Sequence, residues 1–123
     1  MNNQDHNAAA REQFRKGVEQ FNAEKFFDAH ESWEAIWLTA PEPDKTFLQG
    51  ITQVSAAFHH YGQGNSTGAE SLMQKGLLKL EQFPADYREM KLGQLREQLR
   101  VWLAAFAENE GEWSGVRPKI EWI

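Results

Sequence analysis

The sequence predicts an all-α protein, folded as a single-domain bundle of about five helices. Apolar residues recur at positions i, i+4 and i+7 in several separate stretches, which is the spacing of one helix face. Proline and glycine clusters divide these stretches, and none of them has the alternating pattern of a strand. The 123 residues are enough for one domain that buries a core without disulfides or metals.

The composition excludes several classes of protein. The chain has no cysteine, so it forms no disulfide and no thiolate metal site. Its net charge of −5 gives no electrostatic basis for binding nucleic acid. We find no signal-peptide pattern and no segment apolar enough to span a bilayer. We therefore expect a cytoplasmic protein that binds neither nucleic acid nor membrane.

The chain divides into a short tail and one domain. Residues 1–7 are polar, and we expect them to be disordered. The helical domain then covers residues 8–123. Its first helix is predicted over residues 8–21, where the apolar positions are Phe14, Val18 and Phe21. A second helix is predicted over residues 26–39, because the prolines at positions 41 and 43 end it.

A third helix, predicted over residues 44–61, is expected at the centre of the bundle. Residues 46–69 contain no Asp, Glu, Lys or Arg, and a helix without a charged face is usually packed on several sides. A glycine-rich run then breaks the chain. We expect Ser66 or Thr67 to cap a fourth helix that ends near Phe83.

The remaining residues predict a fifth helix and an irregular tail. The helix is expected over residues 90–107, with an apolar face on the bundle. Glycines and a proline make the tail irregular, and we expect four of its apolar side chains to attach it to the bundle. These are Trp113, Ile120, Trp122 and Ile123.

A weak internal repeat relates the first two helices to the next two. At an offset of 40 residues, Phe21 aligns with Tyr61 and Ala29 aligns with Ala69. Each copy reads as helix, short turn and helix, which resembles a tetratricopeptide hairpin although the usual period of that family is shorter.

The second predicted helix has two ionisable residues among aromatic ones. At about 100° per residue, His30 and Glu34 share a face of this helix. Burial of an unpaired carboxylate costs several kcal/mol, so a carboxylate in an apolar stripe needs a partner or a function. The aromatic residues on the same face are Phe26, Trp33 and Trp37.

Two interpretations of this pair stay open. In the first, His30 and Glu34 are catalytic acid–base residues, or ligands of a divalent metal together with His60 of the third helix. Ligand-binding residues would then come from the second and third helices: Trp33, Trp37, Gln49, Gln53 and His60. In the second, the two side chains form a buried structural pair that fixes a helix crossing.

Several short motifs, in this order along the chain, resemble the DUF309 domain family. The motif H-x-x-x-E-x-x-W is formed by His30, Glu34 and Trp37. Further matching pieces lie at residues 17–22, 47–53 and 64–69. The resemblance implies a small all-helical bacterial or archaeal domain, and it implies no particular reaction.

Two classes of function follow from these observations. The first is a small polar site between the second and third helices, which binds a small ligand or metal and is hydrolytic if it is catalytic. The alternative is a non-catalytic, helical-repeat-like module that binds a protein partner, and a homodimer is a third option. The sequence contains no Walker loop, dinucleotide fingerprint or nucleophile elbow, so it leaves open whether the protein is an enzyme.

Overall fold

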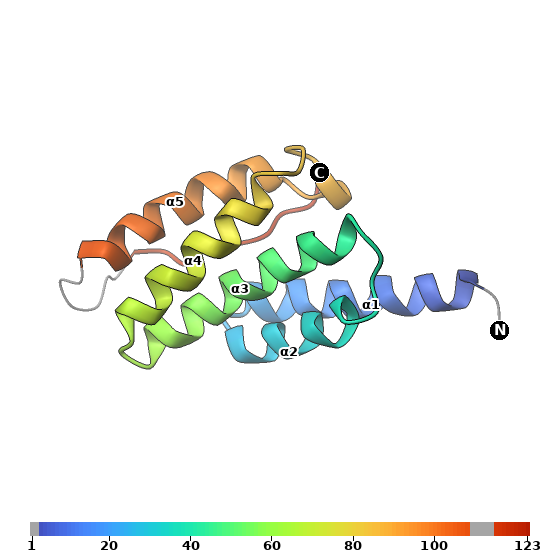
Figure 1. Ribbon diagram of the computed structural model, residues 1–123, viewed down its shortest axis with the longest axis horizontal. Helices are drawn as coiled ribbons and strands as arrows, with labels where there is room; N and C mark the ends of the chain where they lie inside the picture. The colour runs from blue at the N-terminus through green and yellow to red at the C-terminus, as the bar shows by residue number, and fades with distance from the viewer. Residues whose placement is uncertain (1–2, 109–114) are drawn as a thin grey trace.

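The computed structural model describes residues 3–108 and 115–123. Within these residues the chain forms five α-helices and one short 3₁₀ helix (Figure 1). Successive helices pack against one another in chain order, from α1 on α2 to α4 on α5. The predicted all-α bundle is therefore confirmed. The elements are α1 (Asn3–Asn22), α2 (Phe26–Trp37), α3 (Asp44–Gly62), α4 (Ser66–Leu80), η1 (Tyr87–Glu89) and α5 (Leu92–Glu108).

Most predicted boundaries differ from the structure by a few residues. Helix α2 ends at Trp37 and α4 at Leu80, each two or three residues before the predicted end. The cap of α4 is Asn65, whose side-chain oxygen accepts a hydrogen bond from the backbone N–H of Gly68 at 2.9 Å. The predicted caps, Ser66 and Thr67, already lie inside the helix. Helix α1 begins at Asn3, inside the predicted tail, and residues 1–2 lie outside the described residues. Disorder of residues 1–7 stays a prediction.

Helix α3 is the central helix, as the absence of charged residues from position 46 onward predicted. It packs on α2 on one side and on α4 on the other. The contact with α4 is close because two glycines meet: a Cβ added at Gly76 would lie 2.8 Å from the carbonyl oxygen of Gly50. The buried residues of α3 are Phe47, Leu48, Gly50, Ile51, Thr52, Val54, Ser55, Ala57, Phe58 and Tyr61.

The turn of the α1–α2 hairpin repeats in the α3–α4 hairpin. The N–H of Lys25 donates to the carbonyl of Gln20 at 2.8 Å, and 40 residues later the N–H of Asn65 donates to the carbonyl of His60 at 2.9 Å. The residue before each donor has left-handed backbone, with φ of 63° at Glu24 and 80° at Gly64. The offset seen in the sequence is thus a repeated turn geometry. The likeness to tetratricopeptide hairpins stays a prediction.

The last nine residues run back across the bundle and join α1 to η1 (Figure 1). The Asn22 side chain accepts from the Ile120 N–H at 2.7 Å and donates to the Ile120 carbonyl at 2.9 Å. Backbone bonds then link Glu121 to Lys91 and Ile123 to Glu89. We name residues 115–123 the C-terminal strap.

The prediction that apolar side chains attach the C-terminal tail to the bundle is confirmed in part. Ile120 is buried, and the Trp122 ring lies against Phe14 with the ring centroids 6.3 Å apart. The Ile123 side chain is exposed, so the prediction that it anchors the strap is wrong; its backbone makes the contact instead. Trp113 lies outside the described residues. Among the described helices, none has the length and apolarity needed to cross a membrane.

Candidate functional site

The predicted pair of His30 and Glu34 exists, but it lies at the surface. The two residues are one turn apart on α2, and Nε2 of His30 is 3.2 Å from Oε2 of Glu34. The Glu34 side chain is 47% exposed and that of His30 is 28% exposed. The expectation of a carboxylate buried in an apolar stripe is therefore wrong, and water supplies much of the solvation that Glu34 requires.

The two tryptophans of the motif region have different surroundings. Trp33 is fully buried against α1, where its indole N–H donates to the Phe14 carbonyl at 3.1 Å. Its ring fits there because residue 17 is glycine: a Cβ at Gly17 would lie 2.1 Å from the indole nitrogen. Trp37 is half-buried, and the ammonium of Lys45 lies 6.0 Å from its ring centroid. Trp33 is thus a core residue with its polar atom satisfied.

The structure does not bring the predicted residues of α3 to the pair on α2. Gln53 accepts a hydrogen bond from Lys79 of α4 at 3.0 Å. His60 receives one from the Asn65 amide at 3.2 Å, at the turn into α4. Gln49 is half-buried on α3. The histidine nearer α2 is His59, whose ring centroid is 5.1 Å from that of Phe27.

The predicted metal ligands are not assembled. Throughout the described residues, no three His, Asp or Glu side chains are grouped so that they could hold a metal ion. His60 fails because its ring turns to Asn65, the cap of α4, instead of towards α2. His30 has its Nδ1 buried without a hydrogen-bond partner among the described residues, and this is the one polar atom of the pair that the structure leaves unsatisfied.

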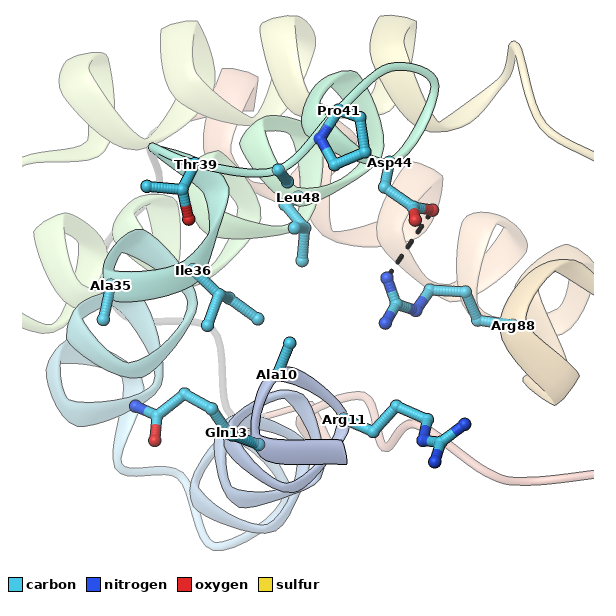
Figure 2. A pocket seen from close by; sticks show the side chains of 12 residues that line it. Ala10, Arg11, Gln13, Ala35, Ile36, Thr39, Pro41, Asp44, Leu48 and Arg88 are labelled. Carbon is cyan, nitrogen blue, oxygen red and sulfur yellow. Dashed lines mark ion pairs between the residues drawn. The ribbon is translucent and has the colours of Figure 1, made fainter. Parts of the chain in front are cut away.

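A groove of about 690 Å³ opens elsewhere, between α1, the end of α2, the start of α3 and η1 (Figure 2). Apolar side chains from three helices form much of its wall. The charged groups of Asp44 and Arg88 lie at the end near η1, and the polar side chains of Gln13 and Thr39 lie on the side away from Arg88. None of the seven residues predicted for the site lines it. Its lining residues are Ala9, Ala10, Arg11, Gln13, Ala35, Ile36, Thr39, Ala40, Pro41, Asp44, Leu48 and Arg88.

Arg88 enters the groove from an unusual backbone conformation. Arg88 and Glu89 are consecutive left-handed residues, with φ of 56° and 64°. Each such non-glycine residue costs of the order of 1 kcal/mol or more, and persists only when its surroundings hold it. The strap does so here, because the N–H of Ile123 donates to the Glu89 carbonyl at 2.9 Å. The chain therefore maintains a strained turn that carries an arginine.

The guanidinium of Arg88 is positioned, but its hydrogen-bonding capacity is unused. It lies 4.3 Å from the centroid of the Phe14 ring, which holds it by a cation–π contact. Its nearest anionic partner is Asp44, with Nη1 3.6 Å from Oδ1, which is too long for a hydrogen bond. Among the described residues it donates no hydrogen bond. A guanidinium has five N–H donors, so several of them remain available to a ligand.

Asp44 is held in place by Tyr87. The Tyr87 hydroxyl donates a short hydrogen bond to Oδ1 of Asp44, the oxygen that also faces Arg88. Burial, followed by this hydrogen bond, raises the pKa of Tyr87 to about 12. The phenol therefore stays protonated at physiological pH and keeps donating to the carboxylate.

The charge of the groove differs from that of the whole protein. Its lining contains two arginines and one aspartate, a formal charge of +1, whereas the chain carries −5. A positively charged end beside an apolar wall suits a small organic anion, whose charge meets Arg88 while its carbon body meets Ile36 and Leu48.

Sequence reasoning missed Arg88 for a physical reason. Residues 84–91 have no helical periodicity, and Arg and Glu are residues that rarely adopt left-handed backbone. Nothing in the sequence therefore indicates a sharp turn there. One signal for a functional residue was available in the sequence. After Pro84, which breaks the helix, the connection between helices contains an aromatic residue, Tyr87, and a charged residue, Arg88.

Comparison with known proteins gives a family. Residues 14–72 match the model of the family described as "Domain of unknown function (DUF309)". An "Uncharacterized protein" of Aquifex aeolicus (strain VF5) is 29% identical over 80 residues, which cover 64% of this chain and 24% of the relative. This chain thus spans about a quarter of that relative's length. The family model covers α2, α3 and parts of α1 and α4, which confirms the resemblance to the DUF309 family over residues 14–72.

Proposed function

We propose that this protein binds a small organic anion in the groove beside Arg88, and that binding rather than catalysis is the role of the groove. The observation that carries the proposal is the state of the Arg88 guanidinium. The Arg88 side chain is 20% exposed, its guanidinium is stacked on Phe14, and it donates no hydrogen bond to a described residue. The contacts with Phe14 and Asp44 leave the N–H donors of the guanidinium unused, whereas a bound anion would accept hydrogen bonds from them.

Three further features support a binding role. The groove is of the size that small-molecule sites have, and a mostly apolar wall with few polar groups is typical of them. The turn that carries Arg88 is strained, and strain is often maintained at functional sites. No nucleophile paired with a base lines the groove, which favours binding over reaction.

Calorimetric titration with a panel of small carboxylates and phosphates at low salt tests the proposal. We expect at least one anion to bind, and to bind about tenfold or more weakly to the variant Arg88→Asn, since a charge-assisted hydrogen bond contributes about 1.5–3 kcal/mol. Asparagine tolerates left-handed backbone, so this variant preserves the turn. Arg100→Gln is the matched control, because Arg100 is an exposed arginine of α5 paired with Glu81 at 3.4 Å. Equal affinities for wild type and Arg88→Asn would exclude this site.

A second candidate is the predicted use of His30 and Glu34 as a hydrolytic or metal-binding pair. The observation in its favour is the 3.2 Å contact together with the buried, unpartnered Nδ1 of His30. For a functional pair, we expect His30→Ala and Glu34→Gln to be as stable as wild type, and a divalent metal to raise the melting temperature of wild type alone. Loss of stability in both variants, without any metal effect, would make the pair structural.

A further inference from the structure

We infer that the groove selects ligands with one negative charge, and that Asp44 is the residue that sets this selectivity. The ligand class is a monocarboxylate with a compact apolar body. This inference rests on the proposed function, because it assumes that an anion binds at Arg88.

Asp44 is held by Tyr87. Its Oδ1 accepts the hydrogen bond of Tyr87 but lies 3.6 Å from the Arg88 guanidinium. The carboxylate is therefore fixed by the phenol and is not a hydrogen-bonded partner of the arginine. A ligand does not have to break a bond between Asp44 and Arg88 in order to reach the free donors. It finds a positive group and a fixed negative group side by side.

The charges of the groove lining match a ligand with one negative charge. Arg11, Arg88 and Asp44 give the lining a formal charge of +1, which one carboxylate neutralises. With a second negative charge on the ligand, the two lining arginines, Asp44 and the ligand would sum to a charge of −1, and Asp44 would repel the added charge. Like charges brought together at a partly desolvated site oppose binding strongly.

The uncharged part of the wall can contact the body of the ligand. It includes alanines and the side chains of Ile36 and Leu48, together with two polar side chains, Gln13 and Thr39 (Figure 2). A hydrocarbon chain or ring gains free energy by covering this surface, in proportion to the apolar area removed from water. A second carboxylate placed against Ile36 or Leu48 would lose hydration there.

Matched probes test the inference directly. Hexanoate and adipate share a six-carbon chain, but adipate has a second carboxylate. Both carboxylates of adipate are ionised near neutral pH. By calorimetry we expect wild type to bind hexanoate about tenfold or more tightly than adipate. In Asp44→Asn, which keeps an acceptor for Tyr87, we expect the difference to fall to about threefold or less.

Tyr87→Phe is a second variant, which does not remove the carboxylate. Without the phenol, Asp44 is free to turn to Arg88 and compete with the ligand. We expect weaker binding of hexanoate and an unchanged preference for it over adipate. Circular dichroism of both variants checks that the helices are intact.

The outcomes separate this inference from the proposed function. If neither probe nor any other anion binds in an Arg88-dependent way, both are wrong. If anions bind through Arg88 but adipate equals or exceeds hexanoate in wild type, or if Asp44→Asn retains the full preference, only the selectivity is wrong. Preference for hexanoate that disappears in Asp44→Asn supports the inference.

Discussion

The two helix hairpins have the same turn but differ beyond it. The turn bonds of α1–α2 recur 40 residues later in α3–α4. In the second hairpin the helices have 19 and 15 residues, and glycines bring them into close contact. In the first they have 20 and 12 residues, about 30 and 18 Å at 1.5 Å per residue. Because α2 stops early, the N-terminal part of α1 is left uncovered, and the groove forms there.

The comparison shows that a groove can result from the length of one helix. The prolines at positions 41 and 43 follow the end of α2 and prevent it from continuing along α1. Variants of Gly17 and Gly76 test the helix contacts of the two hairpins, variants of Glu24 and Gly64 test their turns, and a variant of Tyr87 tests the polar end of the groove.

The close contact within the first hairpin is the most sensitive point. We expect Gly17→Ala to lower the free energy of unfolding by about 3 kcal/mol, because the new methyl would meet the rigid, buried ring of Trp33. The second hairpin has Ala57 and the flexible Met73 at the matching positions. Trp33→Met should therefore reduce the cost of Gly17→Ala. A double-mutant cycle by urea denaturation measures this coupling, and simple additivity would contradict it.

The close contact of the second hairpin should be less costly to disturb. A Cβ at Gly76 would lie 2.8 Å from the Gly50 carbonyl oxygen and 2.9 Å from a methyl of Val54. We expect Gly76→Ala to destabilise the protein by about 2 kcal/mol, since α3 and α4 must move apart. Gly62→Ala is the control, because no atom lies within 4 Å of the added Cβ. A loss of equal size at Gly62 would attribute the effect to something other than helix contact.

The two hairpin turns each have one residue with left-handed backbone, and opposite substitutions at these two positions can be compared. Glu24 and Gly64 occupy equivalent positions, and only glycine adopts this conformation at no steric cost. We expect Glu24→Gly to stabilise the protein by about 1 kcal/mol, and Gly64→Ala to destabilise it by about the same amount. Thermal denaturation of both variants measures the two shifts. Shifts of the same sign would mean that the two turns are not equivalent.

The hydrogen bond of Tyr87 at the polar end of the groove should affect stability at alkaline pH. Because folding raises the pKa of Tyr87 from 10.0 to about 12, the folded state binds the phenolic proton more tightly than the unfolded state. This contribution is complete below pH 10 and is lost as the pH rises towards 12. We expect Tyr87→Phe to lose less stability than wild type between pH 10 and pH 12, measured as urea midpoints. Parallel loss in the two proteins would mean that Tyr87 titrates as it does in the unfolded chain.

The helices could be predicted from the sequence because each depends on local spacing and breakers. The uncharged stretch from residue 46 to 69 also placed α3 at the centre correctly. The pairing of His30 with Glu34 follows from one helix turn. Contacts between helices were less predictable. Whether His59 or His60 approaches α2 depends on the crossing geometry of two helices, which a single-helix projection does not contain.

The groove could not be predicted, because its lining comes from four separated segments. Its key feature, the left-handed turn at Arg88, depends on the hydrogen bond between Glu89 and Ile123, which are distant in sequence. Neighbouring residues give no indication of such a contact. The aromatic residue that orients the guanidinium, Phe14, appeared in the sequence only as a core position of the first helix.

The C-terminal strap has a consequence for how this domain can be transplanted. The family match ends at residue 72, whereas Arg88 and the strap residues that support its turn lie beyond it. A chimera that exchanged only residues 14–72 would carry over most of the apolar wall and leave behind the charged group. Related chains could in the same way keep the helical scaffold and acquire different ligand preferences by replacing one short connection and the segment that braces it.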